Sequence, residues 1–534
     1  MTTLPLPGLA DVLPTSLPPA LQPLDAHNCK LQAAVQPLDW QNPTPADRYD
    51  LVVIGAGTAG LVTAAGTAGL GLGLKVALVE KSLMGGDCLN VGCVPSKAVL
   101  RSSRAVADIR QAASLGVQAA GVTVDFAAVM ERMRRIRADI SHHDSVARFS
   151  QLGIDVFLGA GRFVDSHTLE VAGQRLAFKK AVIATGARAH HPAVPGLTEA
   201  GFLTNETIFS LTDCPPRLLV VGGGPIGCEL AQAFQRLGSQ VTLIQRQERL
   251  LPREEPEASA ILQQRFHSEG MTLALGATLE RVEVAPTGKR VWYRPATSAA
   301  SPSQDDSALQ TVEVDAILIA ARRVPNVDRL GLDAAGVAYD PRQGVSVNDY
   351  LQTSQPHMFA AGDVCMDWKF THAADAAARL VIKNALFAPF GLGRSRLSQL
   401  VMPWVTYTDP EVAHVGLYTH EAEAQGIPYE TITIPLSSVD RALTDGETEG
   451  FVRLLHKAGT DQILGATLVA SHGGDIISEL TLAITTGLGL NALSGVIHPY
   501  PTQAEVLKKA ADAYRRTRLT PRTQAFLKWL ARLS

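Results

Sequence analysis

Two stretches of this chain repeat one pattern, an apolar strand followed by a glycine-rich turn, a helix and a second apolar strand. The turn glycines are Gly55, Gly57 and Gly60 in the first stretch and Gly222, Gly224 and Gly227 in the second. Such a turn lets the backbone approach a pyrophosphate, whose charge then faces the N-terminus of the helix. One turn of this kind can occur without a ligand, but two in one chain predict an α/β fold with two Rossmann-like dinucleotide-binding domains and two nucleotide ligands.

The residue that ends the second strand differs between the two stretches. Glu80 ends it in the first, where a carboxylate can accept hydrogen bonds from ribose hydroxyls. In the second, the strand ends in Gln245 and Arg246, and Arg249 and Arg253 follow. Arginines suit a 2′-phosphate, so this site is predicted to bind NADPH. NADH is the alternative, because the arginines can also belong to an ordinary solvated turn.

Composition excludes several other classes of protein. The 534 residues are 46% hydrophobic with a net charge of −3, so nothing indicates a nucleic-acid partner or a membrane partner. Residues 51–74 lack charge and could span a bilayer, but they contain seven glycines, which the strand–turn–helix pattern explains. The six cysteines are too few for a disulfide scaffold, and the proline-broken N-terminus resembles no secretory signal. These features predict a cytoplasmic protein.

The stretch "GGDCLNVGCVPSK" (85–97) is the most specific in the chain. Cys88 and Cys93 follow a double glycine and precede a Pro-Ser-Lys helix entry. Two cysteines at this spacing can simply be buried thiols, because cysteine is common in protein cores. Directly after a nucleotide-binding unit, however, the stretch resembles the redox-active disulfide of the flavoprotein disulfide reductases. Glutathione reductase, dihydrolipoamide dehydrogenase and mercuric reductase belong to that family.

The resemblance extends over roughly residues 49–517. Besides the glycine turns it includes "ATG" (184–186), "AAGDV" (360–364), "YTDPEVAHVG" (407–416) and "ETEGFVRLL" (447–455). It implies a homodimer whose chain has five parts. These are a Pro-rich N-terminal extension (1–48), the first part of an FAD-binding domain (49–200), an NAD(P)-binding domain (201–330), the second part of the FAD-binding domain (331–400), and an α+β dimerisation domain with a helical tail (401–534).

Three segments outside the motifs have their own predicted conformations. The Pro-rich residues 1–48 are expected to form an extended arm over the surface. The polar insertion 294–310 is typical of a solvated hairpin loop. In the basic tail, the apolar spacing of "TQAFLKWLARLS" (523–534) favours a packing face over a membrane anchor.

Carried over residue by residue, the resemblance implies that FAD binds at the first nucleotide site. Besides the glycine turn, its ligands would be Glu80 at the adenosine ribose and a lining formed by Gly161, Thr185, Gly186 and Asp363. Cys93 would lie against the isoalloxazine ring as the charge-transfer thiol, and Cys88 would meet the substrate. Lys97 and Glu229 match the family's ion pair beside flavin N5, where a cation stabilises the reduced flavin.

Electrons would then pass from NADPH through FAD to the Cys88–Cys93 disulfide, and from the dithiol to an acceptor. The thiolate is the reactive form of cysteine, and the thiol has a pKa of ~8.5 unless its neighbours change it. A helix start and a nearby cation are expected to favour the anion here.

The stretch "HPYPTQAE" (498–505) departs from the family's disulfide reductases. They have a histidine five residues before a glutamate, and the partner subunit contributes both at the outer thiol. Here Tyr500 and Glu505 take these positions. Loss of a placed general acid typically costs ~10²–10⁴ in rate, and a phenol with a pKa of ~10 is a poor base.

Reduction of a soft metal ion held by two thiolates releases no thiol that needs a proton. Mercuric reductase has tyrosine in a similar setting. The acceptor is therefore predicted to be a soft metal ion or a small thiol-reactive molecule, reduced at an active site that two subunits share.

Several features leave other functions open. Tyr500 can be a packed aromatic in a subunit interface, and His498 or water can carry protons in an organic disulfide reductase or a dihydrolipoamide dehydrogenase. A flavin-bearing redox sensor with little turnover is a third alternative. The chain ends without the vicinal cysteines of mercuric reductases, and Arg322 replaces the glycine that usually precedes the family's Arg-x-Pro motif. No resident metal site is expected, because the histidines lack ligand spacing with cysteines or acids.

Overall fold

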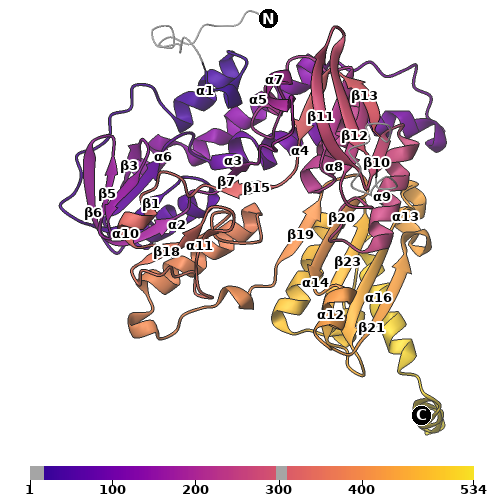
Figure 1. Ribbon diagram of the computed structural model, residues 1–534. Coiled ribbons are helices and arrows are strands. Elements are labelled where there is room, and N and C mark those ends of the chain that lie inside the picture. Colours follow the sequence, from indigo (N-terminus) through magenta and orange to yellow (C-terminus); the bar gives the residue numbers. More distant parts are fainter. Residues whose placement is uncertain (1–16, 296–308, 534) are drawn as a thin grey trace, which may run out of the picture. The chain divides into compact units, whose positions relative to one another are not determined.

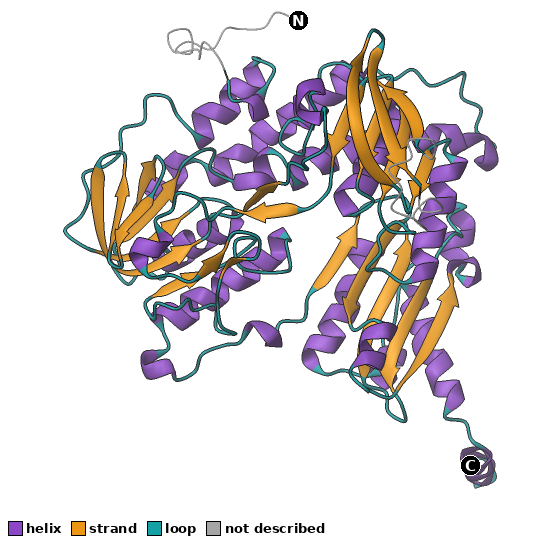
Figure 2. Cartoon of the chain, viewed as in Figure 1, coloured by secondary structure: helices purple, strands orange, loops and turns teal. Residues whose placement is uncertain are grey.

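The computed structural model describes residues 17–295 and 309–533, whose helices and strands are drawn in Figures 1 and 2. Contacts between residues divide the chain into two compact units. The first consists of Met1–Ser102, Val124–Pro215 and Ala316–Leu400, and the second of Ser103–Thr123, Pro216–Asp315 and Val401–Ser534. Each unit contains one of the two glycine-rich turns.

A mostly parallel sheet forms the centre of the first unit, with strand order β3-β2-β1-β6-β5-β4 and with β18 paired to β6. Its strands are β1 (Tyr49–Ile54), β2 (Val76–Glu80), β3 (Ile154–Leu158), β4 (Arg162–Asp165), β5 (Thr168–Val171), β6 (Gln174–Ile183) and β18 (Met358–Ala360). The parallel strands β1 and β2 are almost entirely buried, which explains why they are continuous apolar runs rather than alternating ones. Tyr49, Phe157 and Phe178 are part of the core around this sheet.

Helices α2 (Thr58–Ala68) and α11 (Thr371–Leu386) pack together in the first unit. Its other elements are α1 (Ala26–Val35), α3 (Gly86–Asn90), the start of α4 (Cys93–Gln111), α5 (Phe126–Ile140), α6 (Val146–Gln151), α7 (Leu197–Ala200), α10 (Leu332–Ala335), β7 (Ala187–Ala189), β14 (Ala316–Ile319), β15 (Arg323–Pro325), β16 (Tyr339–Asp340) and β17 (Gly344–Val345). The cysteine stretch therefore forms α3 and the first turn of α4, and each helix carries one cysteine.

The Pro-rich extension contains a helix, so the prediction of an extended arm was wrong for part of it. Residues Ala26–Val35 form α1, which the Asp25 side chain caps by accepting the Asn28 N–H. Leu31 and Val35 are fully buried, and α1 packs against α5. A local cap and buried apolar side chains thus outweigh the neighbouring prolines. Residues 1–16 of the predicted arm lie outside the described residues.

The second glycine-rich stretch forms a smaller parallel sheet in the second unit. The strands of this sheet that belong to the second unit are β10 (Thr272–Leu275), β9 (Gln240–Gln245) and β8 (Arg217–Val221), in that order, with α8 (Pro225–Leu237) between β8 and β9 and α9 (Pro256–Ser268) between β9 and β10. An antiparallel sheet of β11 (Thr278–Ala285), β12 (Gly288–Arg294) and β13 (Gln310–Val314) follows. The predicted hairpin loop connects β12 to β13, and residues 296–308 of it lie outside the described residues.

The C-terminal part of the second unit is an antiparallel sheet with helices. The strand order is β19-β20-β23-β22-β21. The strands are β19 (Pro403–Thr406), β20 (Glu411–Gly416), β21 (Tyr429–Pro435), β22 (Phe451–Lys457) and β23 (Ile463–Ala470), and the helices are α12 (Thr419–Ala424), α13 (Asp440–Asp445), α14 (Gly473–Thr486), α15 (Leu490–Ser494), α16 (Glu505–Thr517) and α17 (Pro521–Leu530). The fold is the predicted α/β class, with two Rossmann-like units and a C-terminal α+β part.

Candidate active site

The three glycines of the first turn have two different roles. Gly55 has a φ of +100°, and a Cβ there would lie 2.3 Å from the Ala184 carbonyl oxygen. A Cβ at Gly60 would lie 1.7 Å from the Gly55 carbonyl oxygen. Gly57, in contrast, caps the N-terminus of α2 with the nearest heavy atom 3.8 Å away, on Gly86. Gly55 and Gly60 therefore allow the backbone to pack, whereas Gly57 leaves the space that a pyrophosphate needs.

Glu80 ends β2 directly behind this turn. Its Oε2 accepts the Ala56 N–H at 2.6 Å, and its Oε1 accepts the Ser82 N–H at 2.7 Å. The side chain is 8% exposed, and burial raises the pKa of the carboxyl group. Because each carboxylate oxygen can accept more than one hydrogen bond, Glu80 can hold the turn and still accept from a ribose hydroxyl.

Three further predicted FAD ligands lie in the same unit. Thr185 donates from Oγ1 to the Asn326 carbonyl at 2.7 Å, and the Asn326 side chain returns a hydrogen bond to the Thr185 carbonyl at 2.9 Å. Gly186 has a φ of +67° and open space around a Cβ position. Gly161 packs against β2, where a Cβ would lie 3.1 Å from a methyl group of Val79. Gly57 and Gly186 thus leave room for a nucleotide, which fits FAD.

Arg323 connects Asp363 to the cysteine stretch, and sequence reasoning assigned it no role. Its guanidinium lies 3.3 Å from the Asp363 carboxylate, and it also pairs with Asp87, the neighbour of Cys88. Burial raises the pKa of Asp363. Arg323 is the arginine of the Arg-x-Pro motif, but the sequence prediction concerned its neighbour Arg322, which is exposed.

Cys88 and Cys93 are held as two thiols in contact. Cys93 begins α4, and its Sγ lies 3.1 Å from Oγ1 of Thr371, the first residue of α11. The hydrogen bond to Cys93, followed by burial, raises the pKa of the Cys88 thiol. The expectation that the surroundings favour the anion was therefore wrong for Cys88. The Cys88 thiol can donate a hydrogen bond to the sulfur of Cys93.

Asn90, between the two cysteines, fixes the loop from both sides. Its Nδ2 donates to the Met84 carbonyl at 3.0 Å and to the Gly86 carbonyl at 2.9 Å. Its own carbonyl accepts from Arg137 Nη1 at 2.6 Å, and Arg137 Nη2 donates to Asn28 Oδ1 at 2.6 Å. Arg137 is fully buried. The N-terminal helix α1 is therefore connected through one arginine to the segment between Cys88 and Cys93.

The second glycine turn repeats the geometry of the first. Gly222 has a φ of +114°, Gly224 caps α8 with open space around a Cβ position, and Gly227 is buried within α8. Gln245, at the end of β9, accepts the Gly223 N–H at 3.1 Å through Oε1.

Three further predicted site residues lie on other elements. Arg246 follows Gln245 and is exposed. Lys97 lies one helical turn after Cys93 on α4, and Glu229 is 5% exposed and accepts the Tyr407 N–H at 3.0 Å. Lys97 and Glu229 belong to different units, so their ion pair stays a prediction.

Tyr500 and Glu505 lie at the start of the C-terminal helical segment. Tyr500 is 69% exposed, and its OH donates to Asp440 at 3.0 Å, which raises the pKa of the phenol. Glu505 begins α16, and its Oε2 is buried without a hydrogen-bond partner among the described residues. The side chain of His498 is only 4% exposed, with Nε2 3.1 Å from Glu479. The exposed side chain in this stretch is thus the phenol rather than the imidazole.

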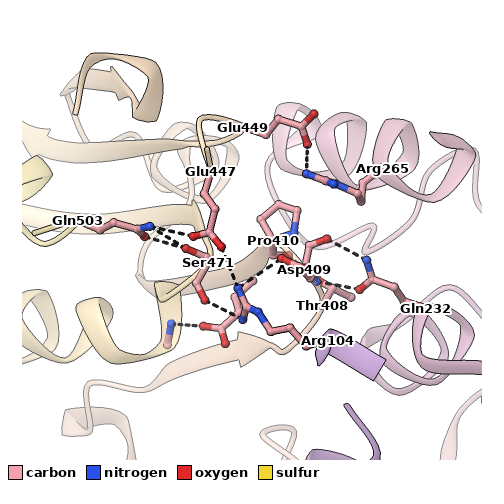
Figure 3. A network of polar contacts seen from close by, with 12 residues as sticks. Arg104, Gln232, Arg265, Thr408, Asp409, Pro410, Glu447, Glu449, Ser471 and Gln503 are labelled. Atoms are coloured by element: carbon pink, nitrogen blue, oxygen red, sulfur yellow. Dashed lines mark hydrogen bonds and ion pairs between the residues drawn. The ribbon is translucent and has the colours of Figure 1, made fainter. Parts of the chain in front are cut away.

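A polar network anchors the loop that carries Tyr500 (Figure 3). Gln503 is 5% exposed and donates to Ser471 Oγ at 2.8 Å and to Glu447 at 3.1 Å. Arg104, on α4, donates to the Ser471 carbonyl at 3.2 Å and lies 3.6 Å from Glu447. The loop is therefore tied to the C-terminal part of α4, which belongs to the same unit.

Two features are absent from residues 17–295 and 309–533. No group of three or more His, Cys, Asp or Glu side chains is arranged to hold a metal ion there. No helix within these ranges has both the length and the apolar character that a membrane crossing requires.

Comparison with known proteins identifies the family. The family model described as pyridine nucleotide-disulphide oxidoreductase matches residues 49–378, and the dimerisation domain of the same family matches residues 402–511. The chain belongs to the pyridine nucleotide-disulphide oxidoreductases. It is accordingly an FAD-dependent flavoprotein oxidoreductase that uses a pyridine nucleotide, as the sequence predicted, and the dimerisation domain indicates a homodimer.

Similar proteins fall into more than one functional class. The mercuric reductase of Lysinibacillus sphaericus is 36% identical, over 87% of this chain and 82% of that protein. The dihydrolipoyl dehydrogenase of Chlamydia muridarum is 33% identical, over 87% of this chain and 96% of that protein. A solved Cu(II) complex of the HOCl-induced flavoprotein disulfide reductase RclA from Escherichia coli has a TM-score of 0.75, with 26% identity over 88% of this chain and 100% of that one.

Proposed function

We propose that this enzyme transfers electrons from NADPH to a soft metal ion, or to a small thiol-reactive acceptor, at the Cys88–Cys93 pair. The observation that carries the proposal is that the phenol of Tyr500, rather than the imidazole of His498, is the exposed side chain of the two. Tyr500 is 69% exposed, whereas the side chain of His498 is 4% exposed and held by Glu479. In the homodimer, Tyr500 and Glu505 of one subunit would serve the cysteines of the other.

The chemistry of the pair suits a soft cation. Two sulfurs in contact offer a bidentate ligand of the kind that soft metals prefer, and the ion displaces the thiol proton that Cys88 retains. No departing thiolate then needs a general acid, so a phenol that stays protonated at neutral pH suffices as a hydrogen-bond donor to sulfur. Bound FAD, cradled at Gly57, Gly186 and Glu80, would supply the two-electron carrier between NADPH and the cysteines. For mercury, NADPH and Hg(II) give NADP⁺, H⁺ and Hg(0).

A panel of acceptors tests this proposal on the purified holoenzyme. Hg(II) and Cu(II) in the presence of excess small thiol should stimulate NADPH oxidation, and lipoamide and oxidised glutathione should not. Tyr500→Phe should lower the metal-dependent rate by about tenfold, since it removes one hydrogen-bond donor. Tyr429→Phe is the matched control, because the Tyr429 OH also donates to a carboxylate, Glu423, at 2.6 Å but lies outside the site.

Cys93→Ser sharpens the same experiment. It should abolish the metal-dependent rate and the long-wavelength thiolate–flavin band that appears when the wild type is reduced anaerobically. A wild-type protein that never develops this band would contradict the proposed electron path. Steady NADPH oxidation with any acceptor argues against a sensor without turnover.

The preference for NADPH rests on the end of β9. Gln245 brings no negative charge to the coenzyme site, and the adjacent Arg246 is exposed, so a 2′-phosphate meets a cation rather than an anion. Arg246→Ala should raise the KM for NADPH about tenfold and leave the KM for NADH unchanged. The exposed Arg342 serves as the control for loss of one positive charge.

Dihydrolipoamide oxidation is the second candidate, because a dihydrolipoyl dehydrogenase is 33% identical over 96% of its own length. It requires a proton carrier, and His498 with Glu479 is the available pair. Lipoamide-dependent turnover that disappears in His498→Ala, with no response to Hg(II), would establish this function instead.

A further inference from the structure

The helix α17 at the C-terminus has an uncovered apolar face. None of its residues is buried, and Figures 1 and 2 draw it apart from the sheet that precedes it. Phe526, Trp529, Leu530 and Leu533 are 56%, 55%, 41% and 67% exposed. The sequence favoured a packing face here, but no residue of α17 is buried in the described chain.

The helix is specified locally and is amphipathic. Thr520 caps it by accepting the Thr523 N–H at 3.2 Å, and Pro521 occupies the first turn, where a missing N–H costs nothing. Phe526, Trp529 and Leu530 of α17, with Leu533 just past its end, recur at the i, i+3, i+4, i+7 spacing that places them on one side of a helix, and Leu527 is offset from that side. The ring centroids of Phe526 and Trp529 are 5.9 Å apart, so these two side chains form one continuous apolar surface. Lys528 falls on the opposite side.

The charge of this tail differs from that of the rest of the chain. From residue 513 onward there is no Asp or Glu, and the basic residues are Arg515, Arg516, Arg518, Arg522, Lys528 and Arg532. The whole chain has a net charge of −3, so the six positive charges of the tail are offset by −9 elsewhere. The expectation of no membrane partner depended on the net charge of the whole chain. That near-neutral value does not show that the C-terminal segment is strongly basic.

We propose that α17 docks on an anionic lipid bilayer, lying in the headgroup plane with Phe526, Trp529, Leu530 and Leu533 towards the acyl chains. A helix with aromatic and leucine side chains on one face and only basic charge around it has the chemistry of such interfacial helices. Lys and Arg beside the bilayer attract anionic headgroups. The match to the family's dimerisation domain ends at residue 511, so α17 lies outside the matched part. A homodimer would present two such helices, which strengthens attachment.

The test is co-sedimentation of the full-length holoenzyme with vesicles. Vesicles of phosphatidylglycerol and phosphatidylcholine in equal parts should bind it, vesicles of phosphatidylcholine alone should not, and salt should weaken the binding. Trp529→Glu should weaken binding at least tenfold, because it places a charge on the apolar side. Gln524→Glu adds the same charge to the same helix on its polar side and should weaken binding much less.

The variants also distinguish a second copy of this chain as the occupant. The oligomeric state of each is measured by analytical ultracentrifugation, and the NADPH-dependent activity reports that the active site is intact. Unchanged dimers with lost vesicle binding in Trp529→Glu support membrane docking. Dissociation of the dimer in Trp529→Glu, with no vesicle binding by the wild type, assigns the face to a second copy and overturns the proposal. The proposal is also overturned if both variants lose vesicle binding to the same extent. Equal binding of the wild type to neutral and to anionic vesicles overturns it as well.

Discussion

The two glycine-rich units use the same backbone device with different side chains. In the first, Glu80 accepts the Ala56 N–H at 2.6 Å, and in the second, Gln245 accepts the Gly223 N–H at 3.1 Å. Both acceptors end the second strand, and both N–H groups lie between the first two glycines of the turn. The turn therefore needs an acceptor at this position in either unit, independent of its charge.

The difference lies in what the acceptor offers to a ligand. A carboxylate only accepts hydrogen bonds, so Glu80 suits the two hydroxyls of an unmodified ribose. The amide of Gln245 is neutral, and its Nε2 already lies 3.5 Å from the Arg249 carbonyl. The second site thus lacks an anion that would repel a 2′-phosphate. We therefore propose that one fold element serves two different nucleotides through a single change of side chain.

Among the substitutions that test this comparison, removal of the Glu80 carboxylate should have the largest effect, which is on FAD affinity. Glu80→Ala leaves the Ala56 and Ser82 N–H groups without their acceptor and removes the predicted ribose contact. We expect FAD affinity to fall at least 100-fold, as each buried unsatisfied group costs about 1–3 kcal/mol. The ratio of flavin to protein absorbance after purification measures this. Gln245→Ala should retain FAD, and equal loss of FAD in both variants would break the assignment of the two sites.

Two alanine substitutions test whether a turn glycine is needed to leave room for a ligand or to let the backbone pack. Gly57→Ala and Gly224→Ala add a methyl group where no heavy atom lies closer than 3.8 Å, so melting temperatures should stay within about 2 °C of wild type. Gly57→Ala should weaken FAD binding about tenfold and Gly224→Ala should do so for NADPH, because each methyl group occupies pyrophosphate space. Gly60→Ala should instead impair folding. A Gly57→Ala protein that unfolds would show that this glycine is needed for packing.

Placing an acid at the end of β9 in the second unit should shift the coenzyme preference from NADPH towards NADH. Gln245→Glu brings a carboxylate towards the ribose, and we expect kcat/KM for NADPH to fall about tenfold while that for NADH is retained or rises. Steady-state kinetics with both coenzymes measures the ratio. Gln240→Glu adds the same charge at the exposed opposite end of β9 and should leave the ratio unchanged. An unchanged ratio in both variants would mean that Gln245 does not face the ribose.

Relief of a positive φ at a residue other than glycine gives the smallest expected effect. Gly55 and Gly222 adopt φ values of +100° and +114°, and Arg322 adopts +55° without being glycine. Relief of this left-handed conformation in Arg322→Gly should stabilise the protein by about 1 kcal/mol. Denaturant unfolding of the holoenzyme measures it. Lower stability in Arg322→Gly would indicate that the side chain makes contacts that outweigh the backbone strain.

The sequence predicted the parts of the site that depend on local pattern. Glycines at fixed spacing specify a strand–turn–helix by themselves, and Cys88 and Cys93 are separated by a single short turn. The contacts of Arg137 could not be predicted, because they join Asn28, Asn90 and a helix from three distant parts of the chain. The pKa of Cys88 was mispredicted for a related reason. A helix start and a cation are visible in the sequence, whereas the burial and the thiol contact that outweigh them arise only on folding.

The link from α1 through Arg137 to Asn90 has a consequence for any shortened form of the chain that lacks α1. A chain shortened to begin at Tyr49 would keep the whole matched family domain yet remove the Asn28 acceptor of a fully buried guanidinium. Water would then hydrate the exposed guanidinium beside Asn90, which lies between the two cysteines in the sequence. Such a truncated enzyme would be expected to purify as a yellow, folded protein whose dithiol nevertheless reacts with alkylating reagents at an altered rate.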